Sequence, residues 1–150
     1  MVDPMKSAVL DNDDISEDAL LEGRVWIRQP REGYRANIDP VLLAAPVPAK
    51  PKQKILDAGA GVGTVSLCLA ARISGLAITA LENNPALATL AVENAKLNGV
   101  DVAVVEGDIA ALPSKITPGS FDHVMANPPF LPETHGHPSP DDIKRAATRE

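Results

Sequence analysis

Apolar residues occur in two kinds of segment along the chain. Short runs of Val, Ile, Leu and Ala with little alternation occupy residues 54–60, 77–83, 102–108 and 121–128. Such runs are typical of strands that are covered on both faces of a parallel sheet. Residues 64–73 and 84–99 read as helices, and the second begins with Asn84 and Pro85 and ends at Gly99. The order of these segments predicts an α/β fold, in which helices flank a parallel sheet.

The residues before this sheet predict a smaller unit. We expect a disordered tail over residues 1–14, a helix over residues 15–21, and strands over residues 24–29 and 34–38. A short helix over residues 39–45 would have Asp39 as its N-cap and Pro40 at its first position. The proline-rich residues 46–53 read as a stiff linker. The chain therefore divides into an N-terminal helix and hairpin segment over residues 15–53 and a main domain over residues 54–150.

Composition favours one globular domain. Of the 150 residues, 45% are apolar and 23% are charged, and no apolar run reaches the roughly 18 residues that a membrane span needs. The acidic N-terminus does not resemble a secretory signal, so we expect a cytoplasmic protein without membrane contact. The net charge of -6 argues against general nucleic-acid binding, although residues 24–35 contain four arginines. Cys68 is the lone cysteine and is expected to be an inert core residue.

A glycine-rich loop separates the first predicted strand of the sheet from the helix that follows it. Gly59, Gly61 and Gly63 follow a strand that carries Asp57 near its end. Glycines let a ligand lie against bare backbone, and the helix N-terminus offers unpaired N–H groups. The spacing is G-x-G-x-G and not the G-x-G-x-x-G of dinucleotide folds. Asp57 stands where a cationic amino group would find a partner, so the loop predicts a cofactor site.

This loop resembles motif I of class I S-adenosylmethionine-dependent methyltransferases, and two more acids agree with it. Glu82 ends the next strand, where a carboxylate can accept both hydroxyls of a ribose. Asp108 ends the strand after that, where it can accept an adenine amine while Ile109 packs on the ring. The resemblance implies a Rossmann-like fold with S-adenosylmethionine as cofactor. It implies cofactor contacts from Asp57, Gly59, Ala60, Gly61, Gly63, Thr64, Glu82, Asn83, Asp108, Ile109 and Asn127.

The fourth predicted strand ends on Asn127, Pro128, Pro129 and Phe130. Prolines fix φ and the residue before a proline is extended, so this corner is stiff. The Asn127 side-chain oxygen and the Pro128 carbonyl can accept the two N–H bonds of an exocyclic amine, and Phe130 can stack on its base. The tetrapeptide resembles motif IV of methyltransferases that act on adenine N6 or on amide nitrogen. The resemblance implies that all four residues are catalytic.

Adenine and glutamine present similar planar amines, so the flanking sequence must distinguish the substrates. Phe130 and the segment from Arg24 to Ala45 resemble the tRNA(Val) adenine-N6-methyltransferase family. The resemblance implies methylation of an adenine in a tRNA anticodon loop, with RNA contacts from Arg28, Arg31, Tyr34, Arg35 and Phe130. The alternatives are a protein-glutamine N5-methyltransferase, an rRNA or DNA amino-methyltransferase, and a cofactor-binding fragment without activity.

The predicted sheet is incomplete by comparison with that fold. About four strands are present, so the strand over residues 121–128 would lie at an exposed edge instead of the centre. We therefore expect that the C-terminal strands are missing from this chain and that it self-associates through this edge. His135 and His137 have a metal-like spacing, but a substrate-facing loop is favoured because no further ligands accompany them. No metal site is predicted.

Overall fold

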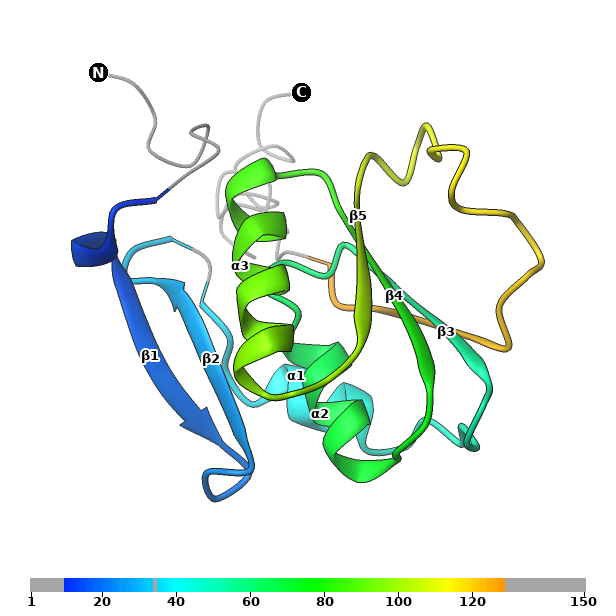
Figure 1. Cartoon of the computed structure of the whole chain (residues 1–150), viewed down its shortest axis with the longest axis horizontal. Helices are drawn as coiled ribbons and strands as arrows, with labels where there is room; N and C mark the ends of the chain where they lie inside the picture. The colour runs from blue at the N-terminus through cyan, green and yellow to red at the C-terminus, as the bar shows by residue number, and fades with distance from the viewer. Residues whose placement is uncertain (1–9, 34, 129–150) are drawn as a thin grey trace, which may run out of the picture.

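A parallel sheet forms the centre of the computed structural model, which describes residues 10–33 and 35–128 (Figure 1). Its order is β5-β4-β3-β6, and all three strand pairings are parallel. The strands are β3 (Lys54–Ala58), β4 (Ala77–Glu82), β5 (Val102–Glu106) and β6 (His123–Ala126). The predicted sheet and its four strands are confirmed. The expected runs extend a little beyond the observed strands because their last residues turn into the loops that follow.

Two helices connect successive strands of the sheet. The first is α2 (Thr64–Arg72), and the second is α3 (Pro85–Leu97), which follows β4. Asn84 caps α3 as predicted, since its Oδ1 accepts the N–H groups of Ala86 at 2.9 Å and Leu87 at 3.2 Å. Cys68 is buried in α2, and burial raises the pKa of its thiol to about 11. A thiol that stays protonated there agrees with the expected core role.

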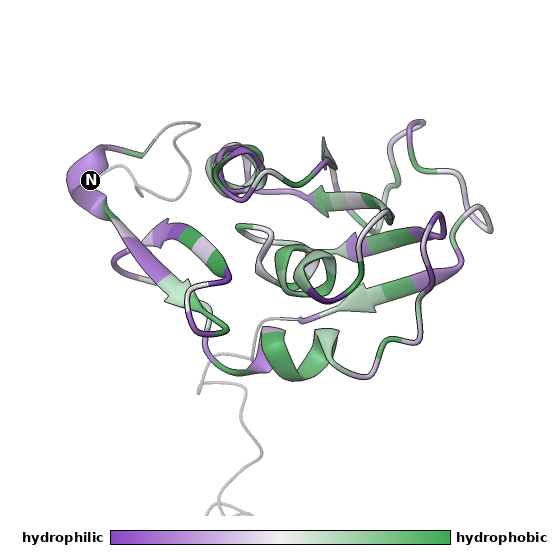
Figure 2. Ribbon diagram, turned by 60° about the horizontal axis from the view of Figure 1, so that its bottom comes forward, coloured by the Kyte–Doolittle hydropathy of each residue, from purple (hydrophilic) through white to green (hydrophobic). Residues whose placement is uncertain are grey.

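Alternate residues of β3 face two different hydrophobic layers. Ile55 packs with Val65 and Leu69 of α2, and with Ala44 of the short helix α1 (Asp39–Ala44). Leu56 faces the other way and packs with Ile116, which belongs to the helix-free connection over residues 107–122. Helices therefore cover one face of the sheet, whereas a loop covers part of the other (Figure 2).

The N-terminal segment forms a hairpin beside α3 (Figure 1). Its strands are β1 (Ile15–Leu20) and β2 (Val25–Pro30), which pair antiparallel, and a short 3-10 turn, η2 (Asn12–Asp14), precedes β1. The strand expected over residues 24–29 is confirmed as β2, but the helix expected over residues 15–21 is wrong. The Asp and Ser residues at its start resemble helix N-caps, but pairing with β2 decided the conformation of this short segment.

The segment that leads from the hairpin to α1 also differs from expectation. The strand predicted over residues 34–38 is wrong for the described residues 35–38, which are irregular. The Ala36 N–H donates to Gln29 Oε1 at 2.8 Å, so a side chain takes the place of a strand partner. Asp39 is not an N-cap but the first residue of α1, and Asn37 Oδ1 accepts its N–H at 2.8 Å. Residues 46–53 contain neither helix nor strand, and Val47 and Ala49 pack against the core that includes Ile55.

Strand β6 forms one edge of the sheet as far as the chain is described. It pairs with β3 on one side, and the side chain of Val124 is 63% exposed. This agrees with the predicted exposed edge, which leaves backbone donors and acceptors available for pairing. Among the described residues, no helix is long and apolar enough to cross a membrane.

Candidate functional site

The carboxyl ends of all four parallel strands meet around one cavity of about 280 Å³. Open α/β sheets bind ligands at this edge. The cavity lining comes from the loop after β3, the end of β4 and the first turn of α3, and from the residues after β5 and β6. It consists of Gly59, Gly61, Leu81, Glu82, Asn83, Leu87, Gly107, Asp108, Ile109 and Asn127. Seven of the residues predicted for the cofactor therefore lie together.

Backbone hydrogen bonds continue past the strand ends and hold these residues in place. The Gly59 N–H donates to the Leu81 carbonyl at 2.8 Å, and the Gly107 N–H donates to the Glu82 carbonyl at 2.9 Å. The pairing of Ala58 with Ala126 places the next residues, Gly59 and Asn127, at the same end of neighbouring strands. Residues far apart in sequence are thus fixed around the cavity by sheet register.

Glu82 links the glycine loop to the end of β4. It is 6% exposed, its Oε2 accepts the Gly61 N–H at 2.7 Å, and its Oε1 accepts the Asn84 N–H at 2.8 Å. A carboxylate has about four acceptor positions, so these two bonds leave capacity for ligand hydroxyls. Glu82 therefore both shapes the loop and presents a carboxylate to the cavity.

Asp57 lies beneath the loop and outside the cavity lining. It is fully buried, and its Oδ2 accepts the Ser66 hydroxyl at 2.6 Å and the Ser66 N–H at 3.2 Å. Its Oδ1 has no hydrogen-bond partner among the described residues. Burial, with the charge of Glu82 adding to it, raises the pKa of Asp57 to about 6, although the bonds from Ser66 oppose the rise. The site thus contains an unsatisfied acceptor close to its acidic wall.

Helix α2 begins directly from the glycine loop. Gly63 is its N-cap residue with φ +86°, a conformation that favours glycine, and a Cβ there would lie 3.5 Å from the Ala91 Cβ of α3. Ala60 and Thr64 are buried and do not line the cavity. The Ala60 N–H donates to the Leu81 carbonyl at 2.9 Å. These residues support the loop from behind.

Asp108 and Ile109 form an exposed rim after β5. Asp108 Oδ1 accepts the Ala110 N–H at 2.8 Å, which closes a tight turn, and Ile109 is 62% exposed. The preceding Gly107 has no room for a side chain, because a Cβ there would lie 2.8 Å from the Cγ of Pro113. Close packing of the turn therefore requires glycine before Asp108.

Asn127 is half-buried at the cavity wall, and Pro128 is exposed. Pro129 and Phe130 lie outside the described residues, as do Tyr34, His135 and His137. No group of three His, Cys, Asp or Glu side chains that could hold a metal occurs in the part of the chain that the structure describes.

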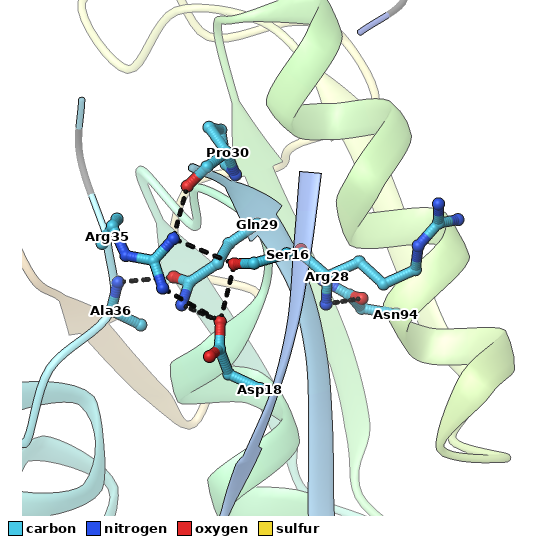
Figure 3. Close-up of polar contacts among 8 residues, drawn as sticks. All are labelled: Ser16, Asp18, Arg28, Gln29, Pro30, Arg35, Ala36 and Asn94. Atoms are coloured by element: carbon cyan, nitrogen blue, oxygen red, sulfur yellow. Dashed lines mark hydrogen bonds and ion pairs between the residues drawn. The ribbon is translucent and has the colours of Figure 1, made fainter. Parts of the chain in front are cut away.

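The predicted RNA-contacting arginines are also structural residues of the hairpin. Arg28 pairs with Glu93 of α3 at 2.6 Å, and Arg31 Nε donates to the Asp13 carbonyl at 2.9 Å. Figure 3 shows Arg35, whose guanidinium donates to Asp18 at 3.1 Å and to the Pro30 carbonyl at 2.9 Å. None of the three lines the cavity around Glu82.

Three cavity residues were missed by the sequence analysis. Leu81 precedes the predicted Glu82, Gly107 precedes Asp108, and Leu87 stands in the first turn of α3. The glycine in front of an acid at a strand end was a usable signal for Gly107. Leu81 and Leu87 read only as core residues, because an apolar side chain in a pattern does not reveal that its core borders a cavity.

Comparisons with known proteins agree with this geometry. The chain is 42% identical over 81 residues to a release factor glutamine methyltransferase of Deinococcus radiodurans, covering 54% of this chain and 28% of that one. It is 34% identical over 128 residues to a tRNA1(Val) (adenine(37)-N6)-methyltransferase of Actinobacillus pleuropneumoniae, covering 83% and 53%. The chain thus spans about half the length, or less, of these curated relatives.

A solved structure and a family model identify the fold and the family. The crystal structure of TYW2 from P. horikoshii in complex with MeSAdo matches with a TM-score of 0.55 and 25% identity, over 68% of this chain and 39% of that one. The fold is thus the Rossmann-like fold of methyltransferases. Residues 36–141 match the model of the methyltransferase small domain. Because this match covers well over half of the sequence, the chain belongs to the methyltransferase small domain family.

Proposed function

We propose that this chain forms the donor-binding and catalytic part of an S-adenosylmethionine-dependent methyltransferase that acts on adenine N6 of tRNA, in the anticodon loop. One observation carries the proposal: Glu82, Asp108 and Asn127 meet the glycine loop around a single cavity at the carboxyl ends of the strands. This arrangement combines acceptors for a nucleoside with an amide beside them.

The residues of the cavity fit the chemistry of this donor. Gly59 and Gly61 expose backbone, Leu81, Leu87 and Ile109 supply apolar walls for a purine, and two carboxylates supply acceptors. Asp57, with its unpartnered Oδ1, lies behind the glycine loop and adds negative charge that favours a cationic amino group at the loop. In this assignment Glu82 holds the ribose hydroxyls and Asp108 accepts the adenine amine.

The donor supplies an electrophilic methyl group on a positively charged sulfur. The chain's own residues position the nucleophile: the Asn127 side-chain oxygen and the Pro128 carbonyl accept the two N–H bonds of the substrate amine. These bonds favour the pyramidal amine, whose lone pair otherwise delocalises into the ring, and turn that lone pair toward the methyl group. Phe130 would stack on the base.

Methyl transfer to the amine needs no ionised base in the site. The donor would supply the methyl carbon to the amine nitrogen, and the electron pair of the broken carbon–sulfur bond would stay on sulfur. The amine then loses one proton to water. Pro128 is exposed, so water reaches this corner.

An RNA substrate is supported by the N-terminal hairpin and by the relative that acts on tRNA1(Val). That relative aligns over 128 residues, whereas three glutamine-modifying relatives align over 81 to 111. Arg28, Arg31 and Arg35 lie along the hairpin, where Arg28 and Arg35 also pair with Glu93 and Asp18, and Tyr34 belongs to the same segment. A tRNA substrate implies action in the cytoplasm.

Radiolabelled methyl transfer tests the substrate and Asn127 together. We expect the protein to label tRNA, and Asn127→Ala to abolish labelling while calorimetry shows nearly unchanged affinity for S-adenosylhomocysteine. Labelling of a release factor and not of tRNA would move the assignment to protein glutamine. Labelling of rRNA or DNA would change the nucleic acid. Binding of S-adenosylhomocysteine without any transfer would leave a donor-binding fragment.

The open edge of β6 supports a further proposal of self-association. The exposed Val124 lies on this strand, and the described residues place no neighbour beyond it. Pairing of two copies along β6 would cover the edge. Light scattering tests this: a dimer that Val124→Lys converts to monomer supports it, and a folded monomeric protein contradicts it.

A further inference from the structure

Asn94 of α3 and Asn98, its C-cap residue, bind the edge of β2 that faces the helix, as a third strand would. Asn94 exchanges two hydrogen bonds with the backbone of Arg28: its Oδ1 accepts the N–H at 2.7 Å, and its Nδ2 donates to the carbonyl at 2.9 Å (Figure 3). Asn98, one turn later, does the same with Trp26, at 2.8 Å and 2.6 Å. The two side chains thus satisfy alternate residues of β2.

The second N–H of each side-chain amide distinguishes the two asparagines. Nδ2 of Asn94 also donates to the Val62 carbonyl in the glycine loop at 2.9 Å. Nδ2 of Asn98 instead donates to the Asn94 carbonyl within α3 at 2.7 Å. Asn94 therefore contacts both the loop and the hairpin, whereas Asn98 contacts the hairpin alone.

The environment of Asn94 makes this contact stiff. Asn94 is fully buried, and its three side-chain bonds use its carbonyl oxygen and both of its N–H bonds. The opposite amide orientation would set donors against the Arg28 N–H, so one arrangement is fixed. Ala91, one turn earlier, packs at the position where a Cβ on Gly63 would lie 3.5 Å away. Helix α3 thus contacts the loop at two points.

The bonded Val62 carbonyl adjoins a residue of the cavity. Gly61 lines the cavity and donates its N–H to Glu82, so the loop is held from the cavity side by Glu82 and from the hairpin side by Asn94. A ligand that narrows the conformations of this loop reduces the entropy cost of ordering the groups bonded to it. Because Asn94 bonds both Val62 and Arg28, such a ligand would also restrict the backbone of Arg28.

We propose that Asn94 is a positioning residue that couples the donor loop to the N-terminal hairpin, so that occupation of the donor cavity tightens the hairpin on α3. The inference rests on the proposed function, because it takes the cavity to be the donor site and the hairpin to face the RNA. By reciprocity, contacts that fix the hairpin tighten donor binding to the same extent.

Amide hydrogen exchange with S-adenosylhomocysteine tests the coupling in the wild-type protein first. The Arg28 N–H is accepted by Asn94 and the Trp26 N–H by Asn98, so each amide reports on one asparagine. We expect the ligand to slow exchange at both amides by about fivefold or more, the lower end of typical coupling. Unchanged exchange in a protein that binds the ligand would overturn the proposal without any variant.

Two matched variants then separate coupling from structural support. In Asn98→Ala, the ligand should still protect the Arg28 amide, and affinity should stay within about twofold of wild type. In Asn94→Ala, the ligand should no longer protect the Trp26 amide, although Asn98 still holds it, and affinity should fall about tenfold. Equal behaviour of the two variants would assign Asn94 a structural role alone. Asn94→Ser, which retains a hydroxyl in a smaller side chain, serves if Asn94→Ala does not fold.

The outcomes also separate this inference from the proposed function. Ligand-dependent protection without methyl transfer to tRNA would refute the proposed reaction but retain the coupling. Methyl transfer to tRNA, with amide protection that is the same in wild type and Asn94→Ala, would retain the proposed reaction but refute the coupling. Failure of the wild-type protein to bind S-adenosylhomocysteine would overturn both.

Discussion

The carboxylate of Glu82 accepts the backbone N–H of Gly61 at 2.7 Å, which joins the end of β4 to the glycine loop after β3. The same carboxylate accepts the Asn84 N–H at 2.8 Å, immediately before α3. One side chain therefore fixes two backbone segments that border the cavity. The same two bonds fix the position of the Glu82 side chain.

Glu82→Gln should weaken both the loop and the site. One carboxylate oxygen becomes an NH₂ group facing a backbone N–H, which leaves a buried donor unsatisfied at a cost of about 1–3 kcal/mol. Urea denaturation should show this loss, and calorimetry should show weaker binding of S-adenosylhomocysteine. Glu106→Gln is the control, because Glu106 lies opposite Glu82 in the β4–β5 register but is exposed. Equal effects of the two changes would contradict the assigned role.

Asp57 should make the protein less stable as the pH rises from about 4 to about 6. Its folded pKa of about 6 exceeds the ordinary value of 3.8, so the folded state holds a proton that the unfolded state has lost. The difference between the two pKa values corresponds to about 3 kcal/mol of folding stability, which is present at acid pH and lost as the pH rises through the folded pKa. Asp57→Asn should remove this dependence, as measured by urea denaturation across that range.

Asp18 provides the opposite sign as a control. The side-chain hydrogen bond from Gln29, with smaller contributions from Ser16 and Arg35, lowers the pKa of Asp18. Its stabilisation is present above pH 4 and is lost as the pH falls through the folded pKa. Asp18→Asn should thus flatten the acid side of the stability profile only. A steeper loss above pH 4 in Asp57→Asn would refute the assignment to Asp57.

Gln29→Leu should cost more stability than Arg35→Ala, although both side chains bond the same oxygen of Asp18. Gln29 is 2% exposed, donates to Asp18 Oδ2 at 2.8 Å and accepts the Ala36 N–H at 2.8 Å (Figure 3). Its loss removes two hydrogen bonds to the half-buried Asp18 and Ala36, at about 0.5–1.5 kcal/mol each. The pair of Arg35 with Asp18 is more than a third exposed on both sides and should contribute about 0–1 kcal/mol. Chemical denaturation of both variants decides the order.

Gly107→Ala should displace the turn that carries Asp108 and Ile109. The added Cβ would lie 2.8 Å from the Cγ of Pro113, so the turn must move, and we expect affinity for S-adenosylhomocysteine to fall about tenfold. Gly119→Ala is the control, because a Cβ there would have no atom within 4 Å. It would add only the strain of a φ of +76°, about 1 kcal/mol. Calorimetry should therefore separate the two. Equal affinities would mean that this turn does not shape the site.

The acids and the glycine loop could be predicted because their positions follow from strand ends. Parallel strands bring their carboxyl ends to one edge, so Glu82, Asp108 and Asn127 had to approach Gly59 once the strands were located. The burial of Asp57 behind the loop could not be predicted. It depends on Ser66, which lies one turn into α2 and takes up one oxygen of the carboxylate.

The hairpin shows where local patterns fail. Asp and Ser residues resemble helix N-caps at the start of the segment, yet residues 15–20 form β1, because a short segment gains more from pairing with β2 than from its own propensity. The contacts of Asn94 with Arg28 and Val62 join residues 66 and 32 positions apart, and nothing local marks them.

By itself, the sequence determined the order of strands and helices in the parallel sheet, the glycine loop and the acids at the strand ends, since hydrophobic periodicity and turn chemistry are local. Only the tertiary structure decided which of these residues face the cavity, which lie behind it, and how α3 joins the loop to the hairpin. Those relationships depend on side-chain direction and on contacts between distant segments, which packing and hydrogen-bond satisfaction select in the folded chain.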